Sequence, residues 1–548
     1  MSLCLSASLS LSLSTSDLMN VSESARKPLL RGSQSDGEMG KSMSRGAPAV
    51  VAYDRVIEDQ GENVDVEGAS IAPPKDARSL AYVIMFLQGI AMLFPWNAFI
   101  TAKNFYELEF KDTPFGNTFE NFFSLAYMSS NLLTYLISFL WVHKVSERSR
   151  IIVPSLITVV ALGVATALCY IESLDPTVYF GITITLVIAS GACAAILQGA
   201  VFALSASLEH DGMYSQAVMS GQGLAGAIVA VSSIVTSASF PPGNNGGVRN
   251  SAFLYFLIAT VIVIVATGGI LVFDRLPFAQ HYRRRMKRVK ASYRHQPDRA
   301  NGDVSASSPA APYTPGASSV ASPGSEFPDS PADIVMLTPG TFQKKWGDDR
   351  HEAEADKEIS LVHVGKKLKP YLFCVCFVFV VTLAMFPGIV VNLVSETPKK
   401  ARFFDDLFIP FNILVFNMGD LFSRLAAGWW RPKWMTAKVL VILSTARILF
   451  IPAFLFCNLV IYKKHELPVV FASDVWPIAF MAFFSFTNGY IVSVSMMNGP
   501  ESVPIAERPS AGTILSFFMN TGLFGGSCLS FVILHFLCGC NPLNPPHV

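Results

Sequence analysis

The stretch LFIPFNILVFNMGDLFSRLAAGWW, residues 407–430, holds one acid and one base inside an otherwise apolar run. A helix needs roughly 20 mainly apolar residues to cross a bilayer, and this run is long enough. Asp420 and Arg424 are four residues apart, so on a helix they lie on one face, where they can pair. Because ionisable residues are rare inside spans and mark function by default, the stretch predicts both a membrane helix and a candidate site.

The charge pair in residues 407–430 has two interpretations. Asn417 lies three residues before Asp420 and joins the same helix face, so these side chains together can bind a polar solute. The alternative is a structural ion pair that holds two helices together. Each charge alone costs about 2.5–3.5 kcal/mol at the bilayer centre, and a pair that faces a wet cavity avoids much of that cost.

The composition of the whole chain agrees with a membrane protein. Of its 548 residues 51% are hydrophobic and only 15% are charged, and the mean hydropathy is +0.43. Soluble domains have about 25% charged residues. The chain has a net charge of +1 and no basic domain of the kind that binds nucleic acid. Its nine cysteines are scattered, and their spacing predicts neither a zinc site nor a disulfide framework.

Similar apolar runs recur along the chain and predict an all-α polytopic membrane protein with about eleven transmembrane helices. Six runs precede a long polar insert and five follow it, which gives a 6+5 arrangement. The expected spans are Leu80–Ala102, Phe122–Val142, Ile151–Ile171, Tyr179–Ser207, Gln216–Phe240, Ala252–Phe273, Pro370–Val394, Leu407–Trp430, Ala437–Tyr462, Val475–Met497 and Gly512–Leu537.

The polar segments set the expected orientation. The insert opens with HYRRRMKRVKASYR, residues 281–294, which has seven Lys or Arg residues and no acid. The positive-inside rule places this flank, and with it the N-terminus, in the cytoplasm. We expect a disordered cytoplasmic tail over 1–78, helices in 79–273 and 369–538, a basic, Ser/Pro-rich disordered cytoplasmic loop over 274–368, and a short extracytoplasmic C-terminus over 539–548.

Polar residues also occur in other expected spans. Gln198 and Gln222 are suited either to a ligand or to hydrogen bonds between helices. Arg447 is a third intramembrane charge, for which we favour a structural role with a carboxylate partner on a neighbouring helix. In LFPWNAFITA, residues 93–102, a proline precedes a tryptophan and an asparagine. This stretch marks either a kink near the membrane surface or a substrate site.

Several function classes find no support in the sequence. It has no HExxH motif, P-loop or Ser/His/Asp constellation, so we expect no enzyme, no catalytic residues, no cofactor and no bound metal. Without an ATP-binding domain a primary pump is not expected either. A polytopic chain with two unequal halves and polar groups at mid-depth is typical of a secondary carrier.

Several motifs, in their order along the chain, resemble the equilibrative nucleoside transporter family. They are LFPWNAFITA (93–102), LQGAVFALSA (197–206), MSGQGLAG (219–226), FNMGDLFSR (416–424), ARILFIPAFLFCN (446–458) and FTNGYIVSVSMMNGP (486–500). The match covers about residues 79–537 and leaves out the N-terminal tail and the central insert. The resemblance implies an eleven-helix carrier that is major-facilitator-like in architecture, with purine and pyrimidine nucleosides, sometimes nucleobases, as substrates.

The resemblance also implies which residues bind the substrate: Trp96, Asn97, Gln198, Phe386, Asn417, Asp420 and Arg424. A base offers a π face for Trp96 and a donor–acceptor edge for Gln198, and ribose hydroxyls can donate to Asp420 and accept from Arg424. On this interpretation Pro95 disrupts the first helix, so that the tryptophan and asparagine after it face a central cavity.

We therefore expect a facilitative carrier that moves nucleosides across a lipid bilayer by alternating access. The alternatives are a nucleobase carrier, a proton-coupled nucleoside carrier with Asp420 as the titratable group, and a non-transporting membrane receptor or scaffold. The plasma membrane is the expected location, with vacuolar, lysosomal or other endomembranes as alternatives. The sequence leaves the oligomeric state, the base preference and the roles of the tail and insert open.

Overall fold

The computed structural model describes residues 74–111, 113, 119–141, 144–171, 173–208, 211–239, 245–294, 360–386, 388–396, 407–461 and 467–538. Most of the expected N-terminal tail, residues 295–359 of the insert and the expected C-terminal segment lie outside these residues.

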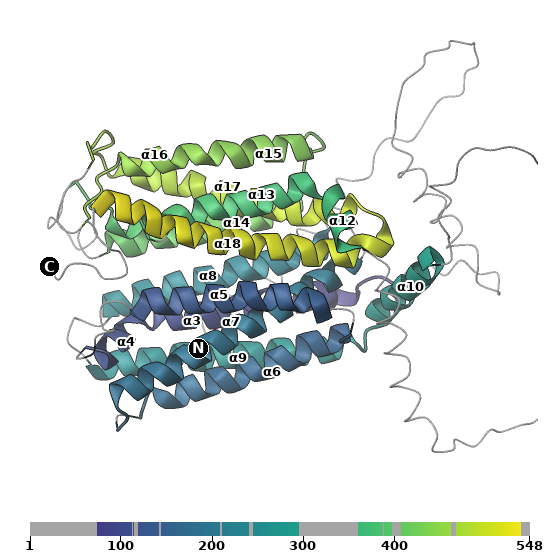
Figure 1. Cartoon of the computed structure of the whole chain (residues 1–548), viewed down its shortest axis with the longest axis horizontal. Helices are drawn as coiled ribbons and strands as arrows, with labels where there is room; N and C mark the ends of the chain where they lie inside the picture. Colours follow the sequence, from purple (N-terminus) through teal and green to yellow (C-terminus); the bar gives the residue numbers. More distant parts are fainter. Residues whose placement is uncertain are drawn as a thin grey trace, which may run out of the picture.

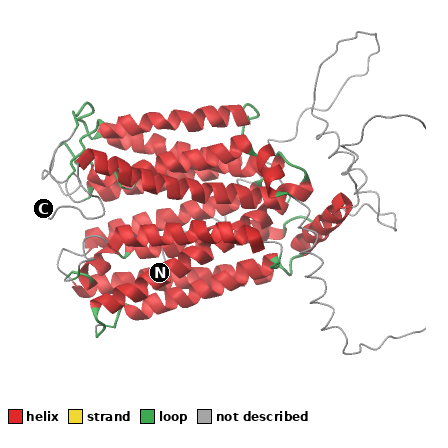
Figure 2. Cartoon of the chain, viewed as in Figure 1, coloured by secondary structure: helices red, strands yellow, loops and turns green. Residues whose placement is uncertain are grey.

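Helices make up nearly all of the described part of the chain (Figure 2). Within it, β-pairing is limited to two isolated bridges, Leu393 with Leu459 and Cys457 with Phe471. The helices are η1 (Ala77–Ser79), α3 (Leu80–Thr101), α4 (Lys103–Glu109), α5 (Phe119–Trp141), α6 (Glu147–Leu168), α7 (Pro176–Ser207), α8 (Met213–Ser239), α9 (Asn245–Phe273), α10 (Pro277–Arg294), α12 (Leu361–Lys367), α13 (Lys369–Met385), η3 (Val390–Asn392), α14 (Phe408–Trp429), α15 (Ala437–Ala446), η5 (Arg447–Leu449), α16 (Phe450–Leu455), α17 (Val475–Glu501), η6 (Ile505–Glu507) and α18 (Arg508–Cys538).

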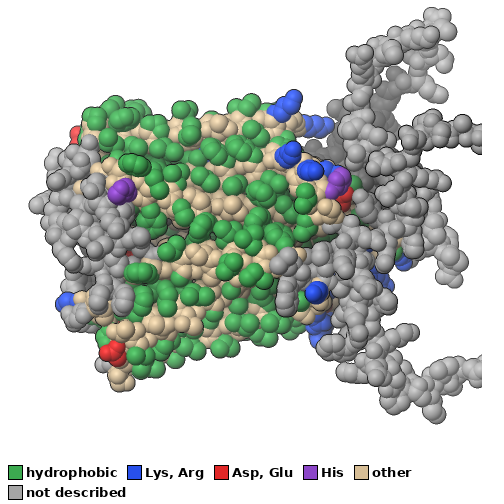
Figure 3. All heavy atoms as spheres, in the orientation of Figure 1, with side chains coloured by type: hydrophobic (Ala, Val, Ile, Leu, Met, Phe, Trp, Pro, Cys, Tyr) green, Lys and Arg blue, Asp and Glu red, His purple; other side chains and the backbone are tan. Residues whose placement is uncertain are grey.

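The helices form a membrane-embedded bundle. In the described part of the chain nine helical segments are long and apolar enough to cross a membrane, with α15, η5 and α16 forming one of them. Two further long helices, α8 and α14, lie among them, α8 against α3 and α14 against α17 (Figure 1). Large apolar side chains cover the outer surface, where Val160 for example is 65% exposed (Figure 3). Such a surface needs lipid around it, so the predicted all-α polytopic fold is confirmed.

The first transmembrane helix differs from the expectation at Pro95. Helix α3 runs without interruption from Leu80 to Thr101, with Pro95 inside it. Proline removes one backbone hydrogen bond, but a membrane helix tolerates this loss where neighbouring helices re-satisfy the freed carbonyl group. The expected disruption of the helix is therefore wrong.

The central insert is also more ordered at its ends than expected. Its basic start forms α10 and its end forms α12, where we predicted disorder. In α10 the side chains of Phe278 and Tyr282 are buried, and the Phe278 ring lies 5.5 Å from the ring of Tyr214. Apolar residues four apart give this basic helix a face that packs against the bundle. The Ser/Pro-rich stretch that follows lies outside the described residues.

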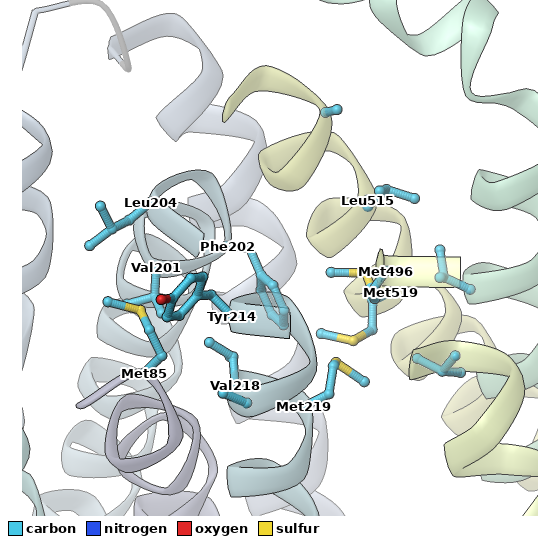
Figure 4. Packing of buried hydrophobic residues seen from close by; sticks show 14 of the residues in the cluster. Met85, Val201, Phe202, Leu204, Tyr214, Val218, Met219, Met496, Leu515 and Met519 are labelled. Atoms are coloured by element: carbon cyan, nitrogen blue, oxygen red, sulfur yellow. The ribbon is translucent and has the colours of Figure 1, made fainter. Parts of the chain in front are cut away.

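The two halves of the bundle share a core at the end where α10 lies. There Met219 of the first half lies near Met496 and Met519 of the second half, in the same hydrophobic cluster as residues of α10 (Figure 4). At the opposite end each half has a cluster of its own, one around Phe105 and one around Phe454. At that opposite end the halves can therefore separate without breaking a shared core.

Candidate functional site

The ion pair predicted on α14 is present. Arg424 Nε donates to Asp420 Oδ2 over 2.6 Å, and the two side chains are 6% and 10% exposed. Asp420 lies nine residues before the end of α14 at Trp429, which is about 14 Å at the rise of an α-helix. Because the hydrocarbon core of a bilayer is about 30 Å thick, this depth is close to its middle.

The pair lies where the two halves meet. Arg424 Nη1 donates to the carbonyl oxygen of Met219 on α8 over 3.3 Å, and Gln216 Nε2 of the same helix donates to the carbonyl oxygen of Arg424 over 3.1 Å. A Cβ atom at Gly223 would lie 3.0 Å from Arg424 Cδ and 3.1 Å from the Leu421 Cα atom. A glycine at this position therefore lets α8 approach the charged face of α14 closely.

A second helix supports the carboxylate. Asn488 Nδ2 of α17 donates to Asp420 Oδ1 over 2.7 Å, and Asn488 Oδ1 lies 2.7 Å from Thr382 Oγ1 of α13. All of these side chains are buried. The sequence analysis missed Asn488 and Thr382. A neutral amide inside an expected span was the available signal for Asn488, since the same signal selected Gln198.

Gln198 lies at a depth similar to that of Asp420, on the other side of the boundary between the halves. It precedes the end of α7 at Ser207 by nine residues, or about 14 Å. Its Oε1 atom accepts a hydrogen bond from Asn520 Nδ2 of α18 over 3.1 Å. The helix–helix hydrogen bond that we weighed against a ligand contact is thus present, although it does not exclude one. Asn520 was also missed.

Trp96 and Asn97 lie farther from the α10 end. Asn97 is 17 residues from the start of α3 at Leu80, or about 26 Å, which is about 12 Å beyond the depth of Asp420. The Trp96 ring lies 4.5 Å from the ring of Tyr127 on α5. Asn97 is 7% exposed, and its Nδ2 atom has no hydrogen-bond partner among the described residues. Buried donors normally find partners, so this nitrogen is suited to a ligand.

The two remaining predicted residues lie on helix contacts. Asn417 Nδ2 donates to the carbonyl oxygen of Ile413 over 2.9 Å, and a Cβ atom at Gly226 of α8 would collide with Asn417 Oδ1. Phe386, at the end of α13, stacks on Phe416 of α14 with 4.0 Å between ring centroids. Asn417 therefore faces the other half of the bundle, and Phe386 belongs to an aromatic contact within its own half.

Arg447 lacks the carboxylate partner expected for it. Among the described residues its direct partners are neutral oxygens: the carbonyl oxygen of Phe484 and the hydroxyls of Thr487 and Thr382. Arg447 starts the 3-10 turn η5, and its guanidinium donates to α13 and α17.

Long lipid-facing helices in two halves, with a buried ion pair at mid-depth on their boundary, define a membrane carrier rather than an enzyme. The chain belongs to the nucleoside transporter family, whose model, described as "Nucleoside transporter", matches residues 181–535.

Known relatives are similar to this chain over most of their length. The chain is 30% identical to human equilibrative nucleoside transporter 1, over 84% of this chain and 98% of that one. It is 28% identical to human equilibrative nucleoside transporter 2, with the same two coverages of 84% and 98%. Equilibrative nucleotide transporter 1 of Arabidopsis thaliana is 25% identical, over 85% of this chain and 88% of its own length.

Solved structures of the major facilitator superfamily resemble the fold distantly. The proton:xylose symporter XylE is 11% identical, with a TM-score of 0.46 over 84% of this chain and 88% of its own. The transporter FucP in its outward conformation is 12% identical, with a TM-score of 0.43 over 85% of this chain and 93% of its own.

Proposed function

We propose that the protein moves purine and pyrimidine nucleosides across a membrane by facilitative alternating access. The observation that carries this proposal is the Asp420–Arg424 pair, buried at mid-depth in α14 and bonded to α8 of the other half. The names of the relatives, which are equilibrative nucleoside transporters, support the choice of substrate.

The ribose and the base bind at different depths in this proposal. Asp420 accepts from a ribose hydroxyl and Arg424 donates to one, which suits a sugar that offers both donors and acceptors. The base extends away from the α10 end toward Trp96 and Asn97. The Nδ2 atom of Asn97 has no partner in the described part of the chain, which supports this direction because a base edge supplies an acceptor for it.

Gln198, Phe386 and Asn417 complete the proposed site. Gln198 exchanges its hydrogen bond with Asn520 for one to the substrate, since its amide carries both donor and acceptor. Phe386 and Asn417 line the cavity beside the ion pair. The stack of the half-buried Phe386 on the buried Phe416 supports a rigid wall on that side.

Access alternates by rocking the six-helix half against the five-helix half. The shared core at the α10 end and the separate cores at the other end support a state that is closed on the α10 side. Reversing this asymmetry would release the substrate on that side. Small shifts between packed halves are amplified in this way because packed cores have discrete arrangements.

The α10 end faces the cytoplasm in this proposal. Arg284, Lys366 and Lys433 are exposed there, and basic groups gather at this end of the molecule (Figure 3). An excess of Lys and Arg in short loops marks the cytoplasmic side. The N-terminus then lies in the cytoplasm too. Residence in the plasma membrane rather than an endomembrane stays a prediction.

Uptake of radiolabelled adenosine and uridine into proteoliposomes that hold the purified protein tests the proposal. We expect saturable uptake that is lost in Arg424→Ala, since this change removes the donor to the ribose and leaves Asp420 buried without its ionic partner. Arg249→Ala is the matched control. Arg249 is also ion-paired, with Glu109 at 2.5 Å, but it lies at the far end of α9.

The expected result is uptake of both nucleosides by the wild type and by Arg249→Ala, with no increase when the outside is acidified. No uptake by a folded wild-type protein, with or without a pH gradient, contradicts the proposal. Uptake that rises with external acidity replaces the facilitative mechanism by proton coupling.

A further inference from the structure

A fully buried arginine lies close to the candidate site but outside it. Arg447 is 1% exposed. Its Nη1 donates to the carbonyl oxygen of Phe484 over 2.7 Å and contacts Thr487 Oγ1, and its Nη2 donates to Thr382 Oγ1 over 2.9 Å. The guanidinium lies 4.5 Å from the centroid of the Phe484 ring. Among the described residues, the direct contacts of this cation are thus neutral oxygens and an aromatic ring.

A chain of hydrogen bonds connects Arg447 to the carboxylate of the site. From Arg447 on η5 it passes to Thr382 on α13, then to Asn488 on α17 and finally to Asp420 on α14. The two later links measure 2.7 Å each. Four separate helical elements therefore meet along one line of polar atoms.

The chemistry of these groups fixes the direction of the chain. An ionised Asp420 only accepts, so the amide nitrogen of Asn488 faces it and the amide oxygen faces Thr382. Arg447 only donates, so the hydroxyl of Thr382 turns a lone pair toward it and its proton away from it. The hydroxyl shares that proton between Asn488 Oδ1 and the carbonyl oxygen of Val378, each of which lies 2.7 Å from Thr382 Oγ1.

Both oxygens of the carboxylate then accept a hydrogen bond from the protein. Arg424 holds Oδ2 and Asn488 holds Oδ1, which together fix the plane of the group. Gly489 permits this arrangement, because a Cβ atom there would lie 2.9 Å from Asp420 Oδ1 and 2.5 Å from its carbonyl oxygen. The orientation of the Asp420 carboxylate is therefore fixed, and each oxygen keeps a lone pair that can accept a further hydrogen bond.

We propose that Arg447 is a positioning residue for substrate recognition, which acts through Thr382 and Asn488 to orient the Asp420 carboxylate toward a ribose hydroxyl. This inference rests on the proposed function, since the hydroxyl is that of a nucleoside. The positive charge of Arg447 polarises the successive hydrogen bonds through Thr382 and Asn488, which strengthens the hydrogen bond from Asn488 to the carboxylate.

The threonines that contact Arg447 supply a matched test. Thr382→Val and Thr487→Val make the same change, and each removes a hydroxyl that contacts Arg447, but only Thr382 leads on to Asp420. Each variant of the full chain is compared in proteoliposomes by the KM and maximal rate of adenosine uptake. The same assay is run with 2′,3′-dideoxyadenosine, which lacks the 2′ and 3′ hydroxyls of the ribose and keeps the 5′ hydroxyl.

We expect Thr382→Val to raise the KM for adenosine about tenfold, which is the effect of weakening one hydrogen bond to a charged group. Its maximal rate per folded protein and its KM for the dideoxy analogue should stay close to wild type. Thr487→Val should leave all of these values close to wild type. If Thr382→Val does not fold, the pair Thr382→Ser and Thr382→Ala gives the same comparison, with serine restoring the hydroxyl.

Equal effects of Thr382→Val and Thr487→Val overturn the inference, as does an equal loss of affinity for adenosine and its dideoxy analogue. The wild type and Asp420→Asn separate this failure from failure of the proposed function. A wild type that takes up no nucleoside contradicts both. A wild type whose preference for adenosine over the analogue is lost in Asp420→Asn supports the proposed function, whatever Thr382→Val does.

Discussion

The second and fourth long helices of each half make contact in different ways. In the first half, α5 and α7 meet where Gly191 lies against the backbone of Tyr127, and the contact is neutral. In the second half, α14 and α17 also meet at a glycine, Gly489, but the atoms that it faces belong to Asp420, which is bonded to Asn488. One contact depends on shape and the other on shape and charge.

This difference assigns different tasks to the two halves. A small-residue contact lets helices approach closely where lipid supplies no hydrophobic drive, and it offers nothing to a polar solute. A buried carboxylate with directed partners costs energy that the fold must offset, and it is retained for recognition. In the proposed function the second half therefore carries the chemistry of the ribose, and the α5–α7 contact of the first half supplies a rigid surface.

The largest effect should come from removing one charge of the Asp420–Arg424 pair in the second half. Asp420→Ala leaves Arg424 buried without its ionic partner, and breaking a buried pair in this way costs about 3–5 kcal/mol. The double variant Asp420→Ala/Arg424→Ala should lose less stability than the sum of the single changes, because it leaves no lone charge. Thermal unfolding of the purified variants in detergent measures both quantities.

Transport should be absent in all three of these variants, including the double variant whose stability is partly restored. Strictly additive losses of stability would mean that the two charges do not interact across the turn of α14. Transport by the double variant would mean that the pair is structural.

An intermediate effect should come from adding a methyl group at the neutral contact between α5 and α7. A Cβ atom at Gly191 would lie 2.7 Å from the carbonyl oxygen of Tyr127 and would collide with Ser130 Oγ. Gly191→Ala should therefore destabilise the protein by about 1–3 kcal/mol, the usual cost of overpacking. Gly163→Ala is the control, because no atom of the described residues lies within 4 Å of a Cβ atom there and alanine favours a helix by up to about 1 kcal/mol.

The affinity for adenosine, measured on the folded fraction, should be unchanged in both glycine variants. A strong loss of affinity in a stable Gly191→Ala protein would show that the α5–α7 contact takes part in recognition, and the division of tasks between the halves would then be wrong.

The sequence allowed some of this comparison to be predicted. Asp420 and Arg424 were predicted to pair because a helix brings residues four apart to one face. Asn488 is 68 residues from Asp420, and apolar periodicity does not tell which helices of a bundle are neighbours. For the same reason the sequence did not show that α3 continues through Pro95. A membrane helix tolerates the lost backbone hydrogen bond through its contacts with neighbouring helices, which the sequence does not identify. In α10 the many basic residues predicted a solvated segment, although Phe278 and Tyr282 pack against the bundle.

The smallest effect should come from changes at Gln198 and Asn520, which test whether Gln198 of the first half binds the substrate. Gln198→Leu and Asn520→Leu both remove the same 3.1 Å hydrogen bond between α7 and α18, so each should cost about 0.6–2 kcal/mol of stability. Their effects on transport should differ. If Gln198 binds the base, its removal lowers nucleoside affinity about tenfold, whereas Asn520→Leu leaves Gln198 in place and changes affinity little. Adenosine KM values for the two variants, measured side by side, decide this. Equal KM values would make Gln198 a helix contact like Gly191 and leave Trp96 and Asn97 to bind the base in the first half.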